Sequence, residues 1–277
     1  MESGTIGGDV AQTSPRPELP ARIAAHDLVC EFDTPRGRVH ALGPVDLVVR
    51  DREFCCLVGP SGCGKSTFLR VVGGLAEPSA GTLSVELFDG ESVCPLAFVF
   101  QDYGIYPWKT TEENVGFGLE IAGLAAAERS ARVRRWIDAL RLTGFEHAYP
   151  RELSGGMRQR VAIARAMAVD PQVLLMDEPF AAVDPQMRVL LQDEVLRLWQ
   201  ADARTVLMVT HSLEEALVLA DRIVVMSARP GRVLSEIEVP FSRPRDESVR
   251  DSAEFWELHQ HLWALLRDQV EPPAAKS

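Results

Sequence analysis

The chain has 277 residues, of which 46% are hydrophobic and 25% charged, and it carries a net charge of −11. This composition is typical of a globular protein with one large or two small domains. The acidic balance argues against a nucleic-acid partner, because phosphate binding needs a basic face. No apolar run reaches the roughly 20 residues that span a bilayer, and no secretory signal pattern is present. We therefore expect a cytosolic protein that reaches a membrane only through a partner.

The first half of the chain alternates β-prone and helical runs. Residues 1 to about 21 are rich in Gly, Pro, Ser and Thr and are predicted to be disordered. Residues 23–32 and 45–49 predict an antiparallel strand pair, and residues 54–58 a buried strand that runs into Gly59. A helix is expected over 66–73, and further strands over 82–88 and 97–100. From 103 to 150 the pattern turns helical, which indicates an inserted subdomain.

The second half alternates more regularly. Helices are predicted over 161–169, 187–199 and 213–219, and strands over 173–176, 206–210 and 223–226. This alternation favours a parallel sheet with helices on both faces. A separate amphipathic helix is expected over 246–270, where Phe255, Leu258, Leu262 and Leu266 recur at helical spacing. It either packs on the core, which we favour, or docks a partner.

A phosphate-binding loop joins the strand at 54–58 to the next helix. The run G-P-S-G-C-G-K-S over 59–66 fits G-x-x-x-x-G-K-[ST] between a strand and a helix, the context that this motif requires. Its backbone amides and the helix N-terminus favour phosphate, Lys65 is expected to reach the β- and γ-phosphates, and the Ser66 hydroxyl to bind Mg²⁺. The nucleotide-binding residues predicted here are Gly59, Pro60, Ser61, Gly62, Cys63, Gly64, Lys65, Ser66 and Thr67.

The five cysteines are odd in number and form no C-x-x-C pair, so neither a disulfide framework nor a zinc site is expected. Cys63 differs from the others because it lies in the phosphate loop at a helix N-terminus. We expect it to react with alkylating reagents and ATP to protect it.

Two acidic residues end the buried strand predicted over 173–176. Asp177 is expected to hold Mg²⁺, and Glu178 to activate the attacking water as a general base. Upstream, Leu153-Ser154-Gly155-Gly156 opens a helix and offers a second set of amides to an anion. The alternative for this run is a serine N-cap with a glycine turn.

The phosphate loop, the Leu153–Gly156 run and the acidic pair follow one another along the chain. Together these three motifs resemble the ATP-binding-cassette (ABC) family, and the resemblance covers roughly residues 22–240. In that family the loop at Ser154, Gly155 and Gly156 contacts the γ-phosphate of ATP held by the opposite subunit. The resemblance implies that Gln101 senses Mg²⁺ and the attacking water, that His211 contacts the γ-phosphate, and that Asp184 belongs to the family's D-loop. It places Phe32 where an aromatic ring stacks on adenine, the alternative being a core phenylalanine.

The implied fold is α/β: a P-loop NTPase (RecA-like) core with an antiparallel β subdomain and an inserted α-helical subdomain over about 103–156. Residues 241–277 would form a tail with the amphipathic helix. The implied cofactors are ATP and Mg²⁺, and the implied partners are a second copy of the chain, an integral-membrane permease and, indirectly, a solute-binding protein.

Within the family, the run from Gln101 to Trp108 is similar to the nitrate/sulfonate/taurine importer branch. The runs 153–160, 177–184 and 227–232 share this similarity, although the Pro-Gly pair in the last also suits an ordinary β-turn. We expect an importer ATPase at the cytoplasmic face of the membrane, in which residues near Tyr103–Trp108 receive a helix of the permease. The alternatives are a soluble ABC ATPase and the ATPase of an exporter.

Overall fold

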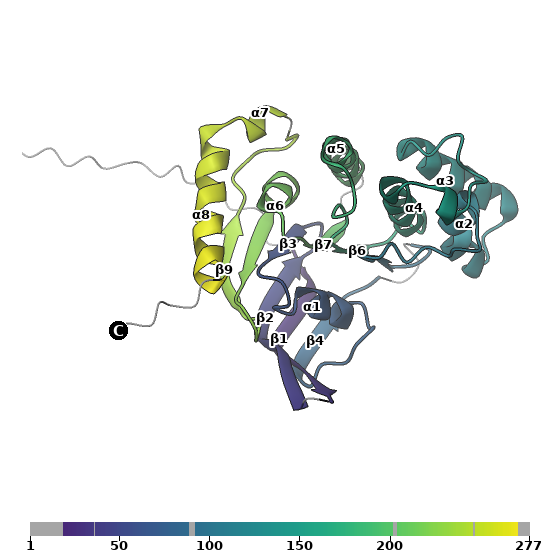
Figure 1. The fold of residues 1–277 in the computed structure, drawn as a ribbon. Coiled ribbons are helices and arrows are strands. Elements are labelled where there is room, and N and C mark those ends of the chain that lie inside the picture. The colour runs from purple at the N-terminus through teal and green to yellow at the C-terminus, as the bar shows by residue number, and fades with distance from the viewer. Residues whose placement is uncertain (1–18, 36, 89–91, 202–203, 246, 271–277) are drawn as a thin grey trace, which may run out of the picture.

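The computed structural model describes residues 19–35, 37–88, 92–201, 204–245 and 247–270. Its centre is a six-stranded sheet in the order β5-β6-β7-β3-β8-β9 (Figure 1). The strands are β5 (Leu96–Val99), β6 (Val173–Asp177), β7 (Thr205–Val209), β3 (Phe54–Val58), β8 (Arg222–Met226) and β9 (Val233–Glu238). Every neighbouring pair is parallel except β8 and β9. The predicted parallel sheet is thereby confirmed, and β9 is an edge strand that the sequence analysis missed.

The four central strands owe their place to continuous apolar sequence. Every residue of β3, β6, β7 and β8 is buried, as expected of parallel strands covered on both faces. By contrast β9 alternates half-buried and exposed residues, because only one of its faces packs on the protein.

A second sheet lies against one face of the first. Its three antiparallel strands have the order β2-β1-β4, with β1 at Ala21–Thr34, β2 at Gly37–Arg50 and β4 at Ala80–Val85. The strand pair predicted from residue 23 is confirmed but longer, and the strand predicted over 82–88 pairs with β1. Most of the segment predicted to be disordered, residues 1–18, lies outside the described residues.

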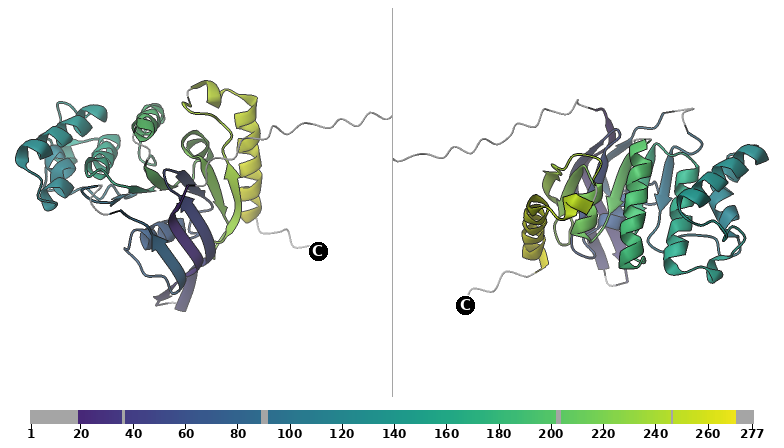
Figure 2. Two further views of the ribbon diagram at one scale, coloured as in Figure 1. Left: turned by 180° about the vertical axis from the view of Figure 1, so that it is seen from behind. Right: turned by 90° about the horizontal axis from the view of Figure 1, so that it is seen from above.

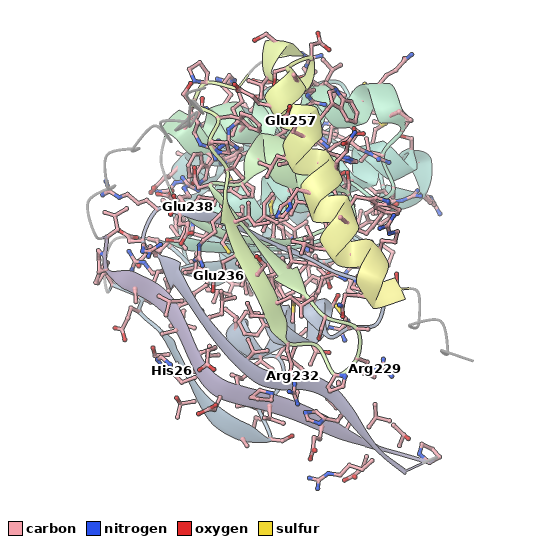
Figure 3. All side chains as sticks on the ribbon, turned by 90° about the vertical axis from the view of Figure 1, so that its left-hand side faces the viewer. His26, Arg229, Arg232, Glu236, Glu238 and Glu257 are labelled. Atoms are coloured by element: carbon pink, nitrogen blue, oxygen red, sulfur yellow. The ribbon has the colours of Figure 1, made fainter. Side chains whose placement is uncertain are left out.

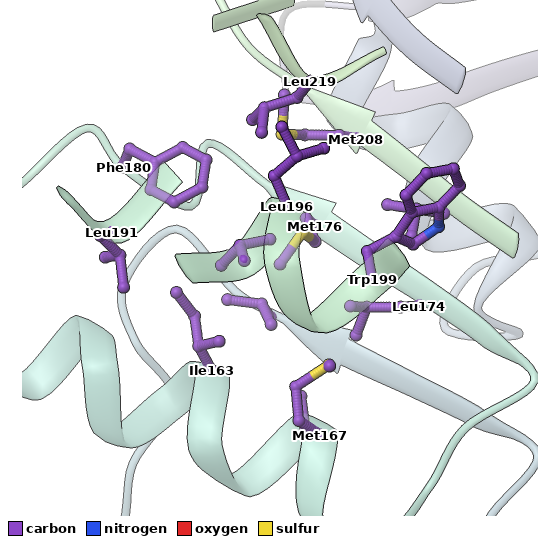
Figure 4. Close-up of a cluster of buried hydrophobic side chains, with 14 of the residues drawn as sticks. Ile163, Met167, Leu174, Met176, Phe180, Leu191, Leu196, Trp199, Met208 and Leu219 are labelled. Atoms are coloured by element: carbon purple, nitrogen blue, oxygen red, sulfur yellow. The ribbon is translucent and has the colours of Figure 1, made fainter. Parts of the chain in front are cut away.

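Helices complete the two faces of the central sheet (Figures 1 and 2). Helix α1 (Lys65–Val72) packs with the antiparallel sheet on one face, against Leu57, Leu175 and Leu207. Helices α4 (Gly155–Ala168), α5 (Pro185–Ala201) and α6 (Leu213–Leu219) cover the other. Figure 4 shows part of that second core, where Met176 and Met208 of the sheet meet side chains of the covering helices.

Between β5 and β6 the chain leaves the core and forms a helical insertion. It contains α2 (Thr111–Ile121), α3 (Ala126–Ala139), a 3-10 turn, η1 (Pro150–Glu152), and leads into α4. Helix α2 begins where the Thr110 side chain accepts a hydrogen bond from Glu113 N, while the Glu113 carboxylate accepts one from Thr110 N, a reciprocal cap that satisfies two otherwise unpaired amides. The predicted helical character is confirmed, but residues 103–110 are turns and extended chain, and α4 begins six residues before the predicted start.

The carboxy-terminal helix predicted over 246–270 is two helices, α7 (Glu247–Arg250) and α8 (Ala253–Val270). The break lies at Ser252, whose hydroxyl accepts a hydrogen bond from Phe255 N and caps α8. Phe255, Leu262 and Leu266 are buried in the core beside α6, as expected of the favoured packing interpretation. Among the described residues, no helix combines the length and apolar character needed to cross a membrane.

Candidate functional site

The predicted phosphate loop occupies the turn between β3 and α1. Gly62 and Gly64 have positive φ angles, 75° and 103°, which glycine adopts without steric cost. A side chain at Gly64 is further excluded because its Cβ would lie 2.7 Å from the carbonyl oxygen of Ala41 on β2. The loop is therefore shaped by glycine at the point where it turns into the helix.

Lys65 lies inside this loop and is only 6% exposed. Its Nζ donates hydrogen bonds to the carbonyl oxygens of Gly59 at 2.7 Å and Pro60 at 2.9 Å. The ammonium group is thus held at the beginning of the loop, beside the backbone that would surround a phosphate.

Ser66 and Asp177 face each other across the end of β6. The Ser66 hydroxyl donates to Asp177 Oδ1 at 2.8 Å, and Asp177 is 3% exposed. Burial raises the pKa of the Asp177 carboxyl above its ordinary value, while the hydrogen bond from Ser66 opposes this rise and the Glu178 charge adds to it. A buried carboxylate beside a hydroxyl is a donor set that suits a hard cation such as Mg²⁺.

Glu178 joins two other predicted residues. Gln101 Nε2 donates to Glu178 Oε2 at 3.2 Å, and His211 Nδ1 lies 3.3 Å from the same oxygen. The backbone of Glu178 has φ of 47°, an uncommon conformation for a non-glycine residue, and its N–H donates to Val209 O of β7. The backbone bond to β7 therefore fixes the direction of a carboxylate that two side chains contact.

The Ser154–Gly156 run lies at the start of α4. Ser154 Oγ accepts a hydrogen bond from Met157 N at 3.2 Å. Ser154 is therefore the N-cap of α4, as the alternative interpretation of this run predicted. A Cβ on Gly155 would lie 3.3 Å from Tyr103 Oη and 3.4 Å from Ala182 O. Within the described part of the chain, no hydrogen bond or ion pair joins this run to residues 59–67.

The two remaining predicted site residues are exposed. Phe32 is 42% exposed on β1, which excludes the alternative of a core phenylalanine. It pairs with Val39 of β2, two residues before Ala41, which touches the phosphate loop. Asp184 caps α5, because its Oδ1 accepts a hydrogen bond from Met187 N at 3.0 Å.

The expectation that Cys63 would react with alkylating reagents is wrong. Cys63 is 1% exposed, because the loop between β8 and β9 lies over it: a Cβ on Gly231 would be only 1.9 Å from Cys63 O. The exposed thiol is that of Cys94. Inside the loop, the Cys63 Sγ atom accepts a hydrogen bond from Lys65 Nζ at 3.7 Å.

The sequence did not predict residues that lie far from the phosphate loop along the chain and contact it in space. Arg229, on the turn that joins β8 and β9, donates from Nε to Gly62 O at 3.1 Å, and the neighbouring Ala228 N donates to Gln269 Oε1 of α8 at 3.4 Å. Figure 3 shows Arg229 and Arg232 at this turn, near the end of α8. The Pro-Gly pair signalled the turn, but nothing local signalled its contact with the phosphate loop. Arg188 and Glu215, which lie behind His211, were likewise missed.

Comparison with known proteins identifies the family. The ABC transporter family model matches residues 42–181. An uncharacterized ABC transporter ATP-binding protein of Methanocaldococcus jannaschii is 44% identical over 259 residues, covering 92% of this chain and 95% of the relative. The nitrate import ATP-binding protein of Synechocystis sp. is 41% identical over 87% of this chain and 93% of its own. The aliphatic sulfonates import ATP-binding protein of Bacillus thuringiensis is 41% identical over 82% and 89%.

A solved structure agrees with these relatives. The ATP-binding cassette described as a dimeric, post-hydrolysis state bound to ADP and Pi is 30% identical, with a TM-score of 0.71, and the match covers 79% of this chain and all of that one. The predicted P-loop NTPase fold is confirmed. The chain belongs to the ABC transporter family, as one of its ATP-binding, ATP-hydrolysing subunits.

Proposed function

We propose that this chain is the ATP-hydrolysing subunit of an ABC importer, in which two copies close on two ATP molecules and drive a permease. The observation that carries the chemistry is the position of Glu178 Oε2, within 3.3 Å of both Gln101 and His211. Asp177, the residue before Glu178 at the end of β6, accepts a hydrogen bond from Ser66 at the start of α1. One compact site therefore contains a base, its orienting partners and a cation-binding pair.

The residues divide the work of hydrolysis among them. The amides of the phosphate loop bind the β- and γ-phosphates, and Lys65 exchanges its bonds to Gly59 O and Pro60 O for phosphate oxygens. Glu178 accepts the proton of the attacking water, while Gln101 and His211 orient the Glu178 carboxylate and the water. Ser66 and Asp177, with Gln101, would hold Mg²⁺, which neutralises phosphate charge when bound.

A second copy supplies what one chain lacks. Ser154 and the Gly155 and Gly156 amides form an anion-binding helix start that is not bonded to the chain's own phosphate loop. The related cassette of known structure is dimeric. This supports a dimer in which the run from Ser154 to Gly156 contacts the γ-phosphate of ATP on the partner, Asp184 lies at the same contact, and Phe32 stacks on the adenine of its own ATP.

The helical insertion provides a surface for the permease. Trp108 is 70% exposed, and its ring lies 5.6 Å from that of Tyr106. The adjoining Lys109 lines a hollow of about 520 Å³ between α2 and α3, together with Glu113, Arg129 and Val133. An exposed aromatic residue beside a polar hollow suits a helix that brings both apolar and charged side chains. Docking there would place the chain at the cytoplasmic face of the membrane.

The solute would be bound by the permease and by a solute-binding protein, not by this chain. Relatives at about 40% identity are named for import of nitrate and of aliphatic sulfonates. We extend this to the present chain as uptake of nitrate, a sulfonate, taurine or a similar small solute.

Co-purification tests the transport assignment. Glu178→Gln protein with MgATP serves as bait on detergent-solubilised native membranes. Lys65→Ala protein, whose affinity for ATP should be reduced, serves as its matched control at an ATP concentration that saturates only the first bait. Capture of a multi-span permease by the first bait supports the importer, and the solute can then be screened on the associated binding protein. A permease that works without a binding protein would favour an exporter, and a soluble partner would overturn the transport role.

A further inference from the structure

The two anion sites of one chain are linked by a short series of contacts. The run at the start of α4 lies against the loop 181–184, because a Cβ on Gly156 would be 3.7 Å from Val183 Cγ1. Arg188, in the first turn of α5, donates from Nη2 to the carbonyl oxygen of Val183 at 3.0 Å. Arg188 therefore contacts a loop that packs against the Gly155-Gly156 pair.

Glu215 on α6 holds the segment that carries His211. Its Oε2 accepts a hydrogen bond from Thr210 Oγ1 at 2.6 Å, and the same hydroxyl accepts one from Ser212 N at 3.0 Å. The residues on both sides of His211 are thus tied to one buried carboxylate. Burial raises the pKa of Glu215, which the hydrogen bond from Thr210 and the charge of Arg188 oppose.

Arg188 and Glu215 face each other across an incomplete contact. Arg188 Nε lies 3.8 Å from Glu215 Oε1, which is beyond hydrogen-bond distance. The Nε atom is buried, and no hydrogen-bond partner for it lies in the part of the chain that the structure describes. A buried donor without a partner is costly, so a small shift of the loop 181–184 that closed this gap would be favourable.

We propose that Arg188 and Glu215 are a positioning pair that transmits occupancy of the Ser154–Gly156 site to His211 and Glu178. The proposal rests on the proposed dimer, in which the ATP of the partner fills that site. Filling it presses on the loop 181–184, the Arg188–Glu215 gap closes, and the His211 segment takes its position beside Glu178. The pair touches neither ATP nor the attacking water.

Purified full-length chains carrying Arg188→Gln, Glu215→Gln or both changes test this coupling. Glutamine at 215 can still accept the hydrogen bond from Thr210 but loses the attraction to Arg188. We expect each single variant to lower kcat roughly tenfold, a typical coupling between sites, while ATP affinity and thermal midpoint stay close to wild type. The double variant should be no slower than the slower single variant.

The control is Arg197→Gln on the same helix, which removes an exposed pair with Glu194 and should leave kcat unchanged. Unchanged kcat in the single variants would overturn the proposal, as would losses that multiply in the double variant or that follow a fall in ATP affinity. Light scattering of the Glu178→Gln chain with MgATP separates this from the dimer: a mass that stays at one chain contradicts the dimer and the coupling together. A doubled mass with independent variants contradicts the coupling alone.

Discussion

The strand ends of the central sheet and the helical insertion differ in the roles that we propose for them, which are ATP hydrolysis and permease binding. At the carboxyl ends of adjacent strands, the phosphate loop follows β3, Glu178 follows β6, and His211 and Gln101 come two residues after β7 and β5. The strands beneath are almost wholly buried, so these side chains are fixed to within the packing of a core. The insertion instead exposes Trp108, in the turn before α2, and Ile121, the last residue of α2. We therefore propose that the chemistry lies at the buried strand ends and that the permease binds the exposed insertion.

The largest effect expected on the strand-end side comes from Glu178→Gln. The substitution keeps the size and the contact with Gln101 but removes the base, so kcat should fall by about 10²- to 10⁴-fold. ATP should still bind. Phosphate-release assays at saturating ATP measure kcat, with Glu214→Gln, an exposed glutamate on α6, as the matched control. Rapid turnover by the Glu178 variant would contradict the general-base role.

Lys65→Ala should weaken ATP binding rather than slow the hydrolysis of ATP that is already bound. Loss of a charged donor to the phosphates costs about 1.5–3 kcal/mol, or roughly 10- to 150-fold in affinity. Titration calorimetry gives the dissociation constant directly. Lys109→Ala, on the insertion, should leave it unchanged, so the two lysines separate the two regions. Equal affinities for wild type and Lys65→Ala would remove Lys65 from the phosphate site.

Trp108→Ala tests whether the insertion binds the permease. An exposed aromatic anchor in a protein interface contributes about 2 kcal/mol, so permease binding should weaken about 30-fold. ATP affinity should not change, since Trp108 lies outside the strand-end site. Trp263→Ala on α8, which is also exposed, is the control. Loss of permease binding in the Trp263 variant alone would move the docking surface to α8.

The smallest expected effect concerns the cap of α2. Thr110→Ala removes the hydroxyl that caps the helix and should cost about 1 kcal/mol, whereas Thr110→Ser should retain most of the stability. Hydrogen bonding to the Thr110 backbone lowers the pKa of Glu113 below its ordinary value. Because the folded pKa is depressed, this contribution is present above the unfolded pKa and is lost as pH falls through the folded one. Thermal unfolding between pH 7 and 3 measures both effects, and identical profiles for wild type and Thr110→Ala would contradict the cap.

Most of the core strands and most of the candidate hydrolytic residues could be predicted because neighbouring residues in the sequence indicate them. A continuous apolar run predicts a buried strand, and the residues at its end follow directly, as with Met176, Asp177 and Glu178. The structure brings Gln101 and His211 to Glu178, a proximity that no spacing in the chain encodes.

The misses have a common cause in long-range packing. Cys63 looked accessible in its own loop and is buried because Gly231, 168 positions further along the chain, packs over it. The contact of Arg229 with Gly62 and the pairing of Arg188 with Glu215 have the same origin. Strand β9 was overlooked because an edge strand with one exposed face lacks the continuous apolar run of its neighbours.

The mass of the Glu178→Gln chain in solution tests the central claim most directly, that two copies close on ATP. Light scattering should report a species near 30.6 kDa without nucleotide and twice that mass with MgATP, returning to the first value with ADP. A mass that stays at one chain under saturating ATP would contradict the account, because the Ser154–Gly156 site would then have no phosphate to receive.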